Sequence, residues 1–226
     1  MFFQRICTTE LLPQSQSSVT QVKYTSLRIL TYIQRNCGLA LERDTVIDVH
    51  TLQCELRSGN VTYDVAEAVS FCLDTNIQNC ENLLQTAMLF YDNLPSSRRR
   101  DIVVHAMLNA PHDLRNTAIT YLTSETTVDS ASLERHSHLW SDLFDTDKGN
   151  DVIVMEKSKY VFQDFMSYCI FVVEAFLDDG TEKLPERLAN LLTLLSQVLS
   201  NHSKEVYTSD NCSVLLPLLL RLLKDA

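Results

Sequence analysis

Glycine and proline are scarce in this chain, and this scarcity restricts its fold more than any other feature. The chain has only 4 glycines and 5 prolines in 226 residues. Gly38, Gly59 and Gly180 each follow an apolar periodic segment, as glycine does just beyond the C-terminus of a helix. Pro111 and Pro185 fall in breaks or first turns, where proline is tolerated. These residues therefore predict helix ends.

Between these breaks the apolar residues recur at helical spacing. Val22 and Ile29 belong to one such stripe, and Val65, Val69, Cys72 and Leu73 form a second. A third stripe consists of Cys80, Leu83, Leu84, Ala87, Met88 and Tyr91. No clear run alternates with the period of two that a strand requires. The sequence predicts an all-α fold with helices over 18–37, 44–58, 62–74, 77–93, 97–109, 112–124, 130–144, 152–178, 184–200 and 213–225. The expected N-caps are Asp44, Thr62, Ser97 and Ser213.

The loops between these helices are short, so neighbouring helices should pack as antiparallel hairpins. Two segments carry a resemblance. Residues 52–73, LQCELRSGNVTYDVAEAVSFCL, look like an armadillo junction, in which an apolar helix ends in a Ser-Gly-Asn turn and small residues follow. Residues 188–225 resemble an inner helix followed by an outer helix.

The chain therefore resembles the armadillo/HEAT helical-repeat superfamily. The resemblance implies a right-handed, solenoid-like stack of five or so hairpins, at about 40 residues per step. It also implies that residues 1–226 form a single helical-repeat domain with an extended surface for a protein partner. The peptide-binding members carry a ladder of Trp and Asn, whereas this chain has one tryptophan, Trp140, so their groove function is not carried over.

Both ends of the chain are apolar. It opens on Met1, Phe2 and Phe3 and closes on LLPLLLRLLKDA, although a solenoid normally needs polar terminal caps. Two interpretations follow. Either the last helix folds back, or the chain is a piece or isoform of a longer solenoid, which is the interpretation we favour.

Charge and cysteine usage restrict the partners and the compartment. The chain has 19 Lys and Arg against 29 Asp and Glu, which gives a net charge of −10. This charge disfavours binding to the phosphates of nucleic acids and to anionic membranes. We therefore expect no direct binding to nucleic acids and no binding to membranes. A small-molecule substrate is not expected either. The seven cysteines include no CxxC pair, which favours reduced thiols and a cytoplasmic or nuclear location.

An acidic segment, Asp145–Glu156, resembles the calcium loop of an EF-hand. Asp occupies the first, third and seventh places and Glu the twelfth, and a hard cation prefers such carboxylates. The sixth place, which should be glycine, is Asn150, and no second loop pairs with it. We favour an acidic inter-helix loop capped by Asp151, with calcium binding as the alternative.

Two histidine patterns could suggest metal ligands. His136 and His138 are two residues apart, so on a helix they point to different sides. His50 and Cys54 are four apart and could face one another, but a zinc site needs three or four ligands. We interpret all four as ordinary core or surface residues.

Two further segments have a structural and a functional interpretation. The turn 96–100, Ser-Ser-Arg-Arg-Arg, is predicted to be solvated, with a docking patch for an acidic partner or a phosphorylation-controlled turn as the alternative. The helix over 152–178 is apolar nearly all round from Phe165 to Leu177. We favour a central core helix over a partner-facing stripe.

Enzyme signatures are missing. The chain has no GxGxxG, P-loop, GxSxG or HExxH motif, so we predict no catalytic, cofactor-binding or metal residues and no cofactor. The expected function is a non-enzymatic scaffold or adaptor in a nuclear (chromosome or DNA-repair) or cytoplasmic complex. The alternatives are a calcium-responsive helical protein that uses 145–156, or a subunit of an enzyme complex of unrecognised helical fold.

Overall fold

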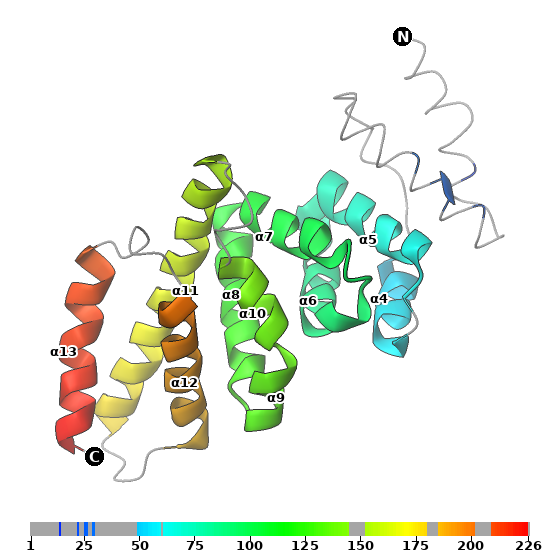
Figure 1. Cartoon of the computed structure of the whole chain (residues 1–226). Coiled ribbons are helices and arrows are strands. Elements are labelled where there is room, and N and C mark those ends of the chain that lie inside the picture. Colours follow the sequence, from blue (N-terminus) through cyan, green and yellow to red (C-terminus); the bar gives the residue numbers. More distant parts are fainter. Residues whose placement is uncertain are drawn as a thin grey trace. The chain divides into compact units, whose positions relative to one another are not determined.

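In a computed structural model the described residues are mainly helical. These residues are 49–59, 61–144, 152–179, 185–201 and 209–225, with single positions at 14, 22, 25, 26 and 29. No strand occurs among them, which confirms the all-α prediction. Contacts within the chain group into two compact units, Met1–Ala106 and Met107–Ala226. Figure 1 shows the helices of both units.

Among its described residues, the first unit contains three longer helices. These are α4 (Val49–Ser58), α5 (Tyr63–Asn76) and α6 (Glu81–Leu89). A π-helical turn at Arg100–Val104 follows, and α7 (His105–Asn109) continues from it. α4 packs on α6 and α5, and α5 packs on the π-helical turn. Ala66, Ala68 and Ser70 of α5 are fully buried, so small side chains let its neighbours approach closely.

The predicted core faces of this unit are confirmed. The apolar stripes on α5 and α6 are buried as their helical spacing requires: Val65, Val69, Cys72, Leu73, Cys80, Leu83, Leu84, Ala87, Met88 and Tyr91. Val22 and Ile29, by contrast, are 39% and 40% exposed, so these two members of the stripe in the helix predicted over 18–37 are not core residues.

The helix predicted over 77–93 is wrong as a single element. The structure divides it into a 3₁₀ turn (Ile77–Asn79), α6 and a second 3₁₀ turn (Tyr91–Asn93). Cys80 and Phe90 leave helical geometry, with ψ of 23° and 33°. Neither position carries glycine or proline, and the apolar spacing runs across both breaks. The sequence therefore contained no signal for them.

The end of α4 and the start of α5 follow their local sequence. Thr62 accepts a hydrogen bond from the Val65 amide at 3.3 Å, so the predicted N-cap of α5 is confirmed. Gly59 has a φ of +80°, the left-handed conformation expected just beyond a helix. Of the other predicted N-caps, Ser97 precedes the π-helical turn, Ser213 lies inside the last helix, and Asp44 lies outside the described residues.

Replacing Gly59 should test this turn. We expect Gly59→Ala to destabilise the chain by about 1–2 kcal/mol, because a Cβ is unfavourable in the left-handed region. The cost is purely conformational, since an added Cβ would have no heavy atom within 4 Å. Gly59→Asn is the matched control, because asparagine tolerates this conformation. Urea unfolding followed by far-ultraviolet circular dichroism measures both, and equal midpoints for the two variants would contradict the prediction.

The second unit consists of six helices among the described residues. They are α8 (His112–Thr126), α9 (Ser130–Arg135), α10 (Ser137–Phe144), α11 (Val152–Asp179), α12 (Glu186–Asn201) and α13 (Ser209–Asp225). α8 begins directly after Pro111, as predicted. α12 begins directly after Pro185, at Glu186, whereas the prediction began this helix at residue 184. α13 begins at Ser209, whereas the prediction began this helix at residue 213, and it contains Pro217 in its interior, as the predicted range does.

The helix predicted over 130–144 is interrupted at one residue. His136 has a ψ of 2° and separates α9 from α10. Its ring is 96% buried, and its Nδ1 lies 3.3 Å from the Thr126 hydroxyl. The Trp140 indole donates to the same hydroxyl at 3.0 Å. This buried polar contact with α8 occurs at the break in the helix. The residues that it joins are too far apart in sequence for apolar periodicity to predict the contact.

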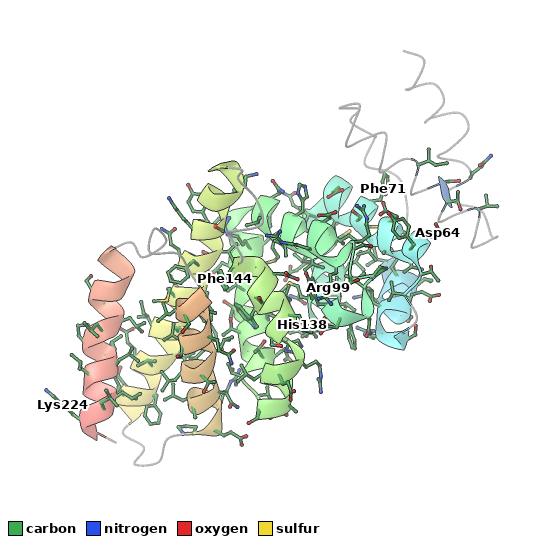
Figure 2. All side chains as sticks on the ribbon, in the orientation of Figure 1. Asp64, Phe71, Arg99, His138, Phe144 and Lys224 are labelled. Carbon is green, nitrogen blue, oxygen red and sulfur yellow. The ribbon has the colours of Figure 1, made fainter. Side chains whose placement is uncertain are left out.

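The long helix α11 is the centre of the second unit. It packs against α8, α13, α12 and α10, while α12 packs against α9 and α10. Within this unit, Figure 1 shows α10 and α12 in front of α8 and α11. An aromatic cluster joins α10 to α11: Trp140, Phe144, Phe162 and Phe165, with ring centroids 5.1 to 6.2 Å apart. Figure 2 shows Phe144 among the helices of the unit.

Candidate interaction surface

The apolar helix α11 has a buried face and an exposed face. Phe165 and Met166 are fully buried, whereas Phe171 is 67% exposed. The buried face is thus the expected core face of this helix. Only the exposed face could contact a partner. The segment Lys157–Asp178 is also long and apolar enough to cross a membrane by length and composition alone, with 39% of it buried. Core helices of soluble proteins share this property, so it does not distinguish a helix in a membrane from a helix in a protein core.

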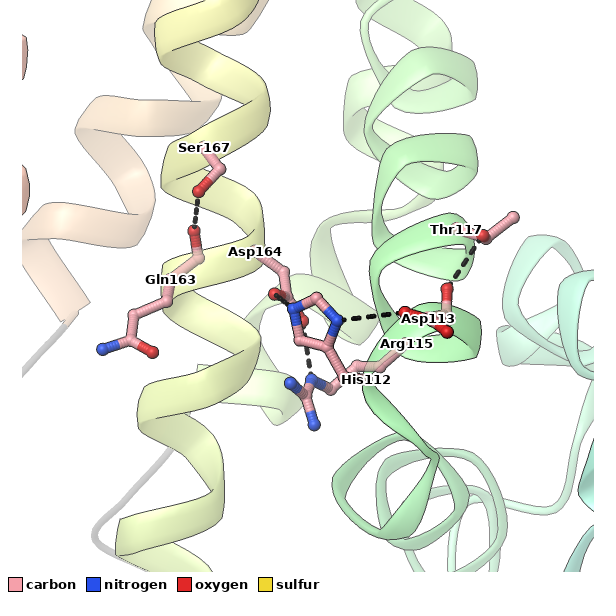
Figure 3. A network of polar contacts seen from close by, with 7 residues as sticks. All are labelled: His112, Asp113, Arg115, Thr117, Gln163, Asp164 and Ser167. Carbon is pink, nitrogen blue, oxygen red and sulfur yellow. Dashed lines mark hydrogen bonds and ion pairs between the residues drawn. The ribbon is translucent and has the colours of Figure 1, made fainter.

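A charged contact inside the second unit joins α8 to α11. The Arg115 Nε donates to Asp164 Oδ2 at 2.6 Å, and both side chains are more than nine-tenths buried. The exposed His112 lies 3.5 Å from the other Asp164 oxygen, and the Arg115 guanidinium lies 5.4 Å from the ring centroid of Tyr160. Figure 3 shows Asp164 reaching from α11 towards these α8 side chains. Because each buried charge has its partner, the arrangement fixes the helix pair and does not resemble a site poised for chemistry.

The arginine turn also makes internal contacts. Arg98 bonds to the buried Glu67 through Nε at 2.6 Å, and it also contacts Asp101. Arg99 bonds to Asp92 at 2.6 Å and lies over the ring of Tyr91 at 5.0 Å. Both arginines are only about one-fifth exposed. The predicted solvated turn is therefore wrong for these two residues, and so is a docking patch that relies on them, because both side chains are held against the first unit.

The histidine patterns separate as predicted. His136 is buried and His138 is exposed, so the two point to different sides. His50 and Cys54 do face one another, with 3.7 Å between Nδ1 and Sγ. Within the described part of the chain, no group of three or more His, Cys, Asp and Glu side chains could hold a metal ion. In the calcium-like segment Asp145–Glu156, residues 145–151 and the side chains of 152–156 lie outside the described residues.

The described cysteines are free thiols. Cys72, Cys80 and Cys169 are buried on the apolar faces where the sequence placed them, and Cys54 is exposed. Burial raises the pKa of the Cys169 thiol far above its usual range. A hydrogen bond with Cys72 lowers the pKa of Cys80, and the effect of burial opposes this shift. A buried thiol whose pKa is raised, as that of Cys169 is, acts as a packing residue.

The N-cap of α9 should make the stability of the folded chain slightly sensitive to acid. The backbone amide of Ser132 donates to Asp129 at 2.7 Å, and this bond is the main reason why the pKa of Asp129 is lowered. A lowered folded-state pKa means that the stabilisation is present above the unfolded carboxyl pKa and is lost as pH falls through the folded value. Asp129→Asn keeps an acceptor but cannot titrate.

We therefore expect the stability difference between the wild type and Asp129→Asn to be largest near neutral pH and to shrink below about pH 4. Urea midpoints from pH 6 to 2.5, followed by the fluorescence of Trp140, measure this difference. A difference that stays constant across that range would show that the charge of Asp129 does not contribute.

The clearest exposed apolar surface lies on α13. Three of its leucines, Leu216, Leu220 and Leu223, are 60%, 51% and 75% exposed, and we call them the leucine stripe. Leu215 and Leu222 on another face are almost fully buried. The exposed face of α12 is polar by comparison: Thr193, Ser196, Gln197 and Ser200. The sequence identified α13 as apolar, but it could not tell which of its leucines are covered.

Comparison with known proteins identifies no family for this chain: no protein-family model, curated protein or solved structure matches it.

Proposed function

We propose that the chain is a non-enzymatic scaffold or adaptor that binds another protein, built as a right-handed, solenoid-like stack of helical hairpins of the armadillo/HEAT kind. It would act in a cytoplasmic or nuclear complex. The observation that carries the proposal is the alternating way in which the helices pack within each unit.

In a two-layer helical stack each helix contacts its hairpin neighbour and the helix two places further along. The second unit has this pattern when α9 and α10 are counted as one interrupted helix. α8 then packs on α11 and α11 on α13, while α10 packs on α12. The first unit repeats it, with α4 on α6 and α5 on the π-helical turn. This regularity supports a stack, whose long exposed surfaces suit the binding of other proteins.

The polar contacts in the described residues support the same role. The buried charges Glu67 and Asp164 each bond to an arginine of a neighbouring element. They therefore hold the helices in place. Surface properties would then decide what the protein binds, and the exposed apolar side chains on α11 and α13 are suited to contact another chain.

Affinity purification of the tagged full chain from cells that express it natively tests the proposal. Mass spectrometry would identify the retained proteins at moderate salt, and direct binding of purified components would verify each one. A parallel purification with the core variant Phe165→Ala identifies chaperones that bind destabilised protein. These chaperones are then removed from the set of candidate partners. We expect at least one stoichiometric partner that is specific to the wild type and binds directly.

The proposal fails if the wild type retains no stoichiometric partner, or if every retained protein binds the core variant equally well. Cross-linking of a verified complex would add a second check. Cross-links should fall on exposed helix faces, and a partner that cross-links only outside the helices would contradict the scaffold role.

A further inference from the structure

Two buried thiols meet where α5 ends and α6 begins. Cys72 lies in the last two turns of α5, and Cys80 is the N-cap residue of α6. Their side chains are hydrogen-bonded to each other, and they are only 3% and 5% exposed. Neither thiol is part of a disulfide. The fold therefore holds two reduced cysteines, one in α5 and one at the start of α6, in direct contact.

The break at Cys80 sets the position of this contact. Cys80 has a φ of −116° and a ψ of 23°, and its amide donates to the Ile77 carbonyl at 3.1 Å, which closes the 3₁₀ turn. α5, this turn and α6 all contact one another in the first unit (Figure 1). A helix that continued across residues 77–93 would not begin at Cys80. The break thus gives this cysteine the N-cap position of a helix and a sulfur neighbour on the preceding one.

The surroundings of Cys80 favour its thiolate. The Cys72 thiol donates its hydrogen bond to the Cys80 sulfur, which lowers the pKa of Cys80 although burial opposes the shift. Cys80 also stands at the positive end of the α6 macrodipole, where a thiolate is stabilised. Cys169, by contrast, lies in the middle of α11 and is fully buried, and its pKa is raised. Cys80 is therefore the nucleophile of the pair, and Cys72 is the thiol placed to react with it.

We propose that Cys72 and Cys80 form a reversible redox pair, which hydrogen peroxide converts into a disulfide that ties α5 to the start of α6. The Cys80 thiolate attacks one oxygen of the peroxide, whose O–O bond breaks, and the products are a sulfenic acid on Cys80 and hydroxide. The Cys72 sulfur then attacks the Cys80 sulfur, the S–O bond breaks, and the departing hydroxide takes the Cys72 proton and leaves as water. The two thiols lose two electrons, and both peroxide oxygens end in water.

The disulfide would restrict the first unit and would be removable. It closes a short loop that contains the 3₁₀ turn, so it limits how far α5 and α6 can separate. α4 packs on both of these helices, so the bond should make local opening of the unit less frequent. Cellular dithiols reverse such a bond by thiol–disulfide exchange, and disulfides of this transient kind serve as redox sensors in reducing compartments.

Peptide mass spectrometry of the full chain tests the proposal. The folded protein is treated with hydrogen peroxide, unfolded in urea, alkylated with iodoacetamide and digested with trypsin. Trypsin releases residues 58–98 as one peptide, whose only cysteines are Cys72 and Cys80. We expect this peptide to lose the mass of two hydrogen atoms and to take up no alkyl group, and dithiothreitol should restore both alkylation sites. The pair should react at least about tenfold faster than Cys169.

Single replacements separate the two roles. Cys72→Ser should stop Cys80 at the sulfenic acid, which dimedone captures, whereas Cys80→Ser should leave Cys72 as a thiol. Cys169→Ser is the matched control and should form the disulfide at the rate of the wild type. Circular dichroism would show that each variant is folded. In the wild type, amide hydrogen exchange at the start of α6 should slow on oxidation and recover with dithiothreitol.

Several results would overturn the proposal. One is a 58–98 peptide that still takes up two alkyl groups after a peroxide dose that oxidises the exposed Cys54. Another is a disulfide that joins Cys72 or Cys80 to a different cysteine. Disulfide formation that is as fast in the urea-unfolded chain would show that the fold does not bring the pair together. Unchanged amide exchange in the oxidised chain would show that the bond does not tie the two helices.

Discussion

Truncating Phe165 to alanine should destabilise the second unit by about 3–5 kcal/mol, the range typical of a buried aromatic residue replaced by alanine. Phe165 is fully buried on α11, and its ring lies 5.1 Å from Trp140 and 6.1 Å from Phe144. Removing the ring would leave a cavity between α10 and α11, because close-packed neighbours relax only in part.

Phe171→Ala is the matched control for this truncation. It is the same change on the same helix, at a side chain that is 67% exposed, and it should alter stability by less than about 0.5 kcal/mol. Trp140 is the only tryptophan of the chain and lies in the affected cluster, so its fluorescence in urea reports this unit directly. Similar midpoints for Phe165→Ala and Phe171→Ala would mean that the two faces of α11 are not divided as described.

Breaking the buried ion pair should have an effect of similar size. We expect Asp164→Ala to cost about 3–5 kcal/mol, because it would leave the Arg115 guanidinium buried without its anion. Arg115 and Asp164 are only 9% and 7% exposed, so solvent screens this pair little. His112 is 70% exposed and can rehydrate, so its contact with Asp164 should contribute little to the loss.

Two variants separate the loss of the pair from general damage to α11. Asp178→Ala removes an exposed carboxylate from the same helix and should change stability by less than about 0.5 kcal/mol. The double replacement Arg115→Met with Asp164→Leu removes both charges and should recover most of the stability, because buried pairs are often replaced by apolar residues at little cost. The Trp140 unfolding midpoint measures all of them. A double variant as unstable as Asp164→Ala would show that the loss comes from packing and not from the unpaired charge.

Much of the helical fold was predictable because its signals are local. A proline before α8 and before α12, a glycine after α4 and a threonine cap on α5 each act within one turn of backbone. The apolar spacing also predicted which faces of α5 and α6 are buried. The breaks at Cys80, Phe90 and His136 were missed because apolar spacing continues across them and none is glycine or proline.

The polar contacts depend on residues that are distant in sequence. Arg98 was interpreted as part of a solvated turn because three arginines in a row usually face water, and its partner Glu67 lies 31 positions earlier. Arg115 and Asp164 are 49 positions apart, and neither carries a motif that predicts the other. A pairing of this kind follows from which helices become neighbours, and single-sequence periodicity does not contain that information.

The amino-acid pattern alone predicts that this protein is α-helical, where several of its helices begin and end, and that α11 and α13 are apolar. Helix formation and capping arise from interactions between residues within about four positions of each other. Which apolar residues are core and which are surface depends on tertiary packing. The leucines of α13 extend over somewhat more than half of its circumference, which is a wider face than one neighbouring helix covers. Among the described elements α13 packs mainly on α11, and in this arrangement Leu215 and Leu222 are buried while the leucine stripe is exposed.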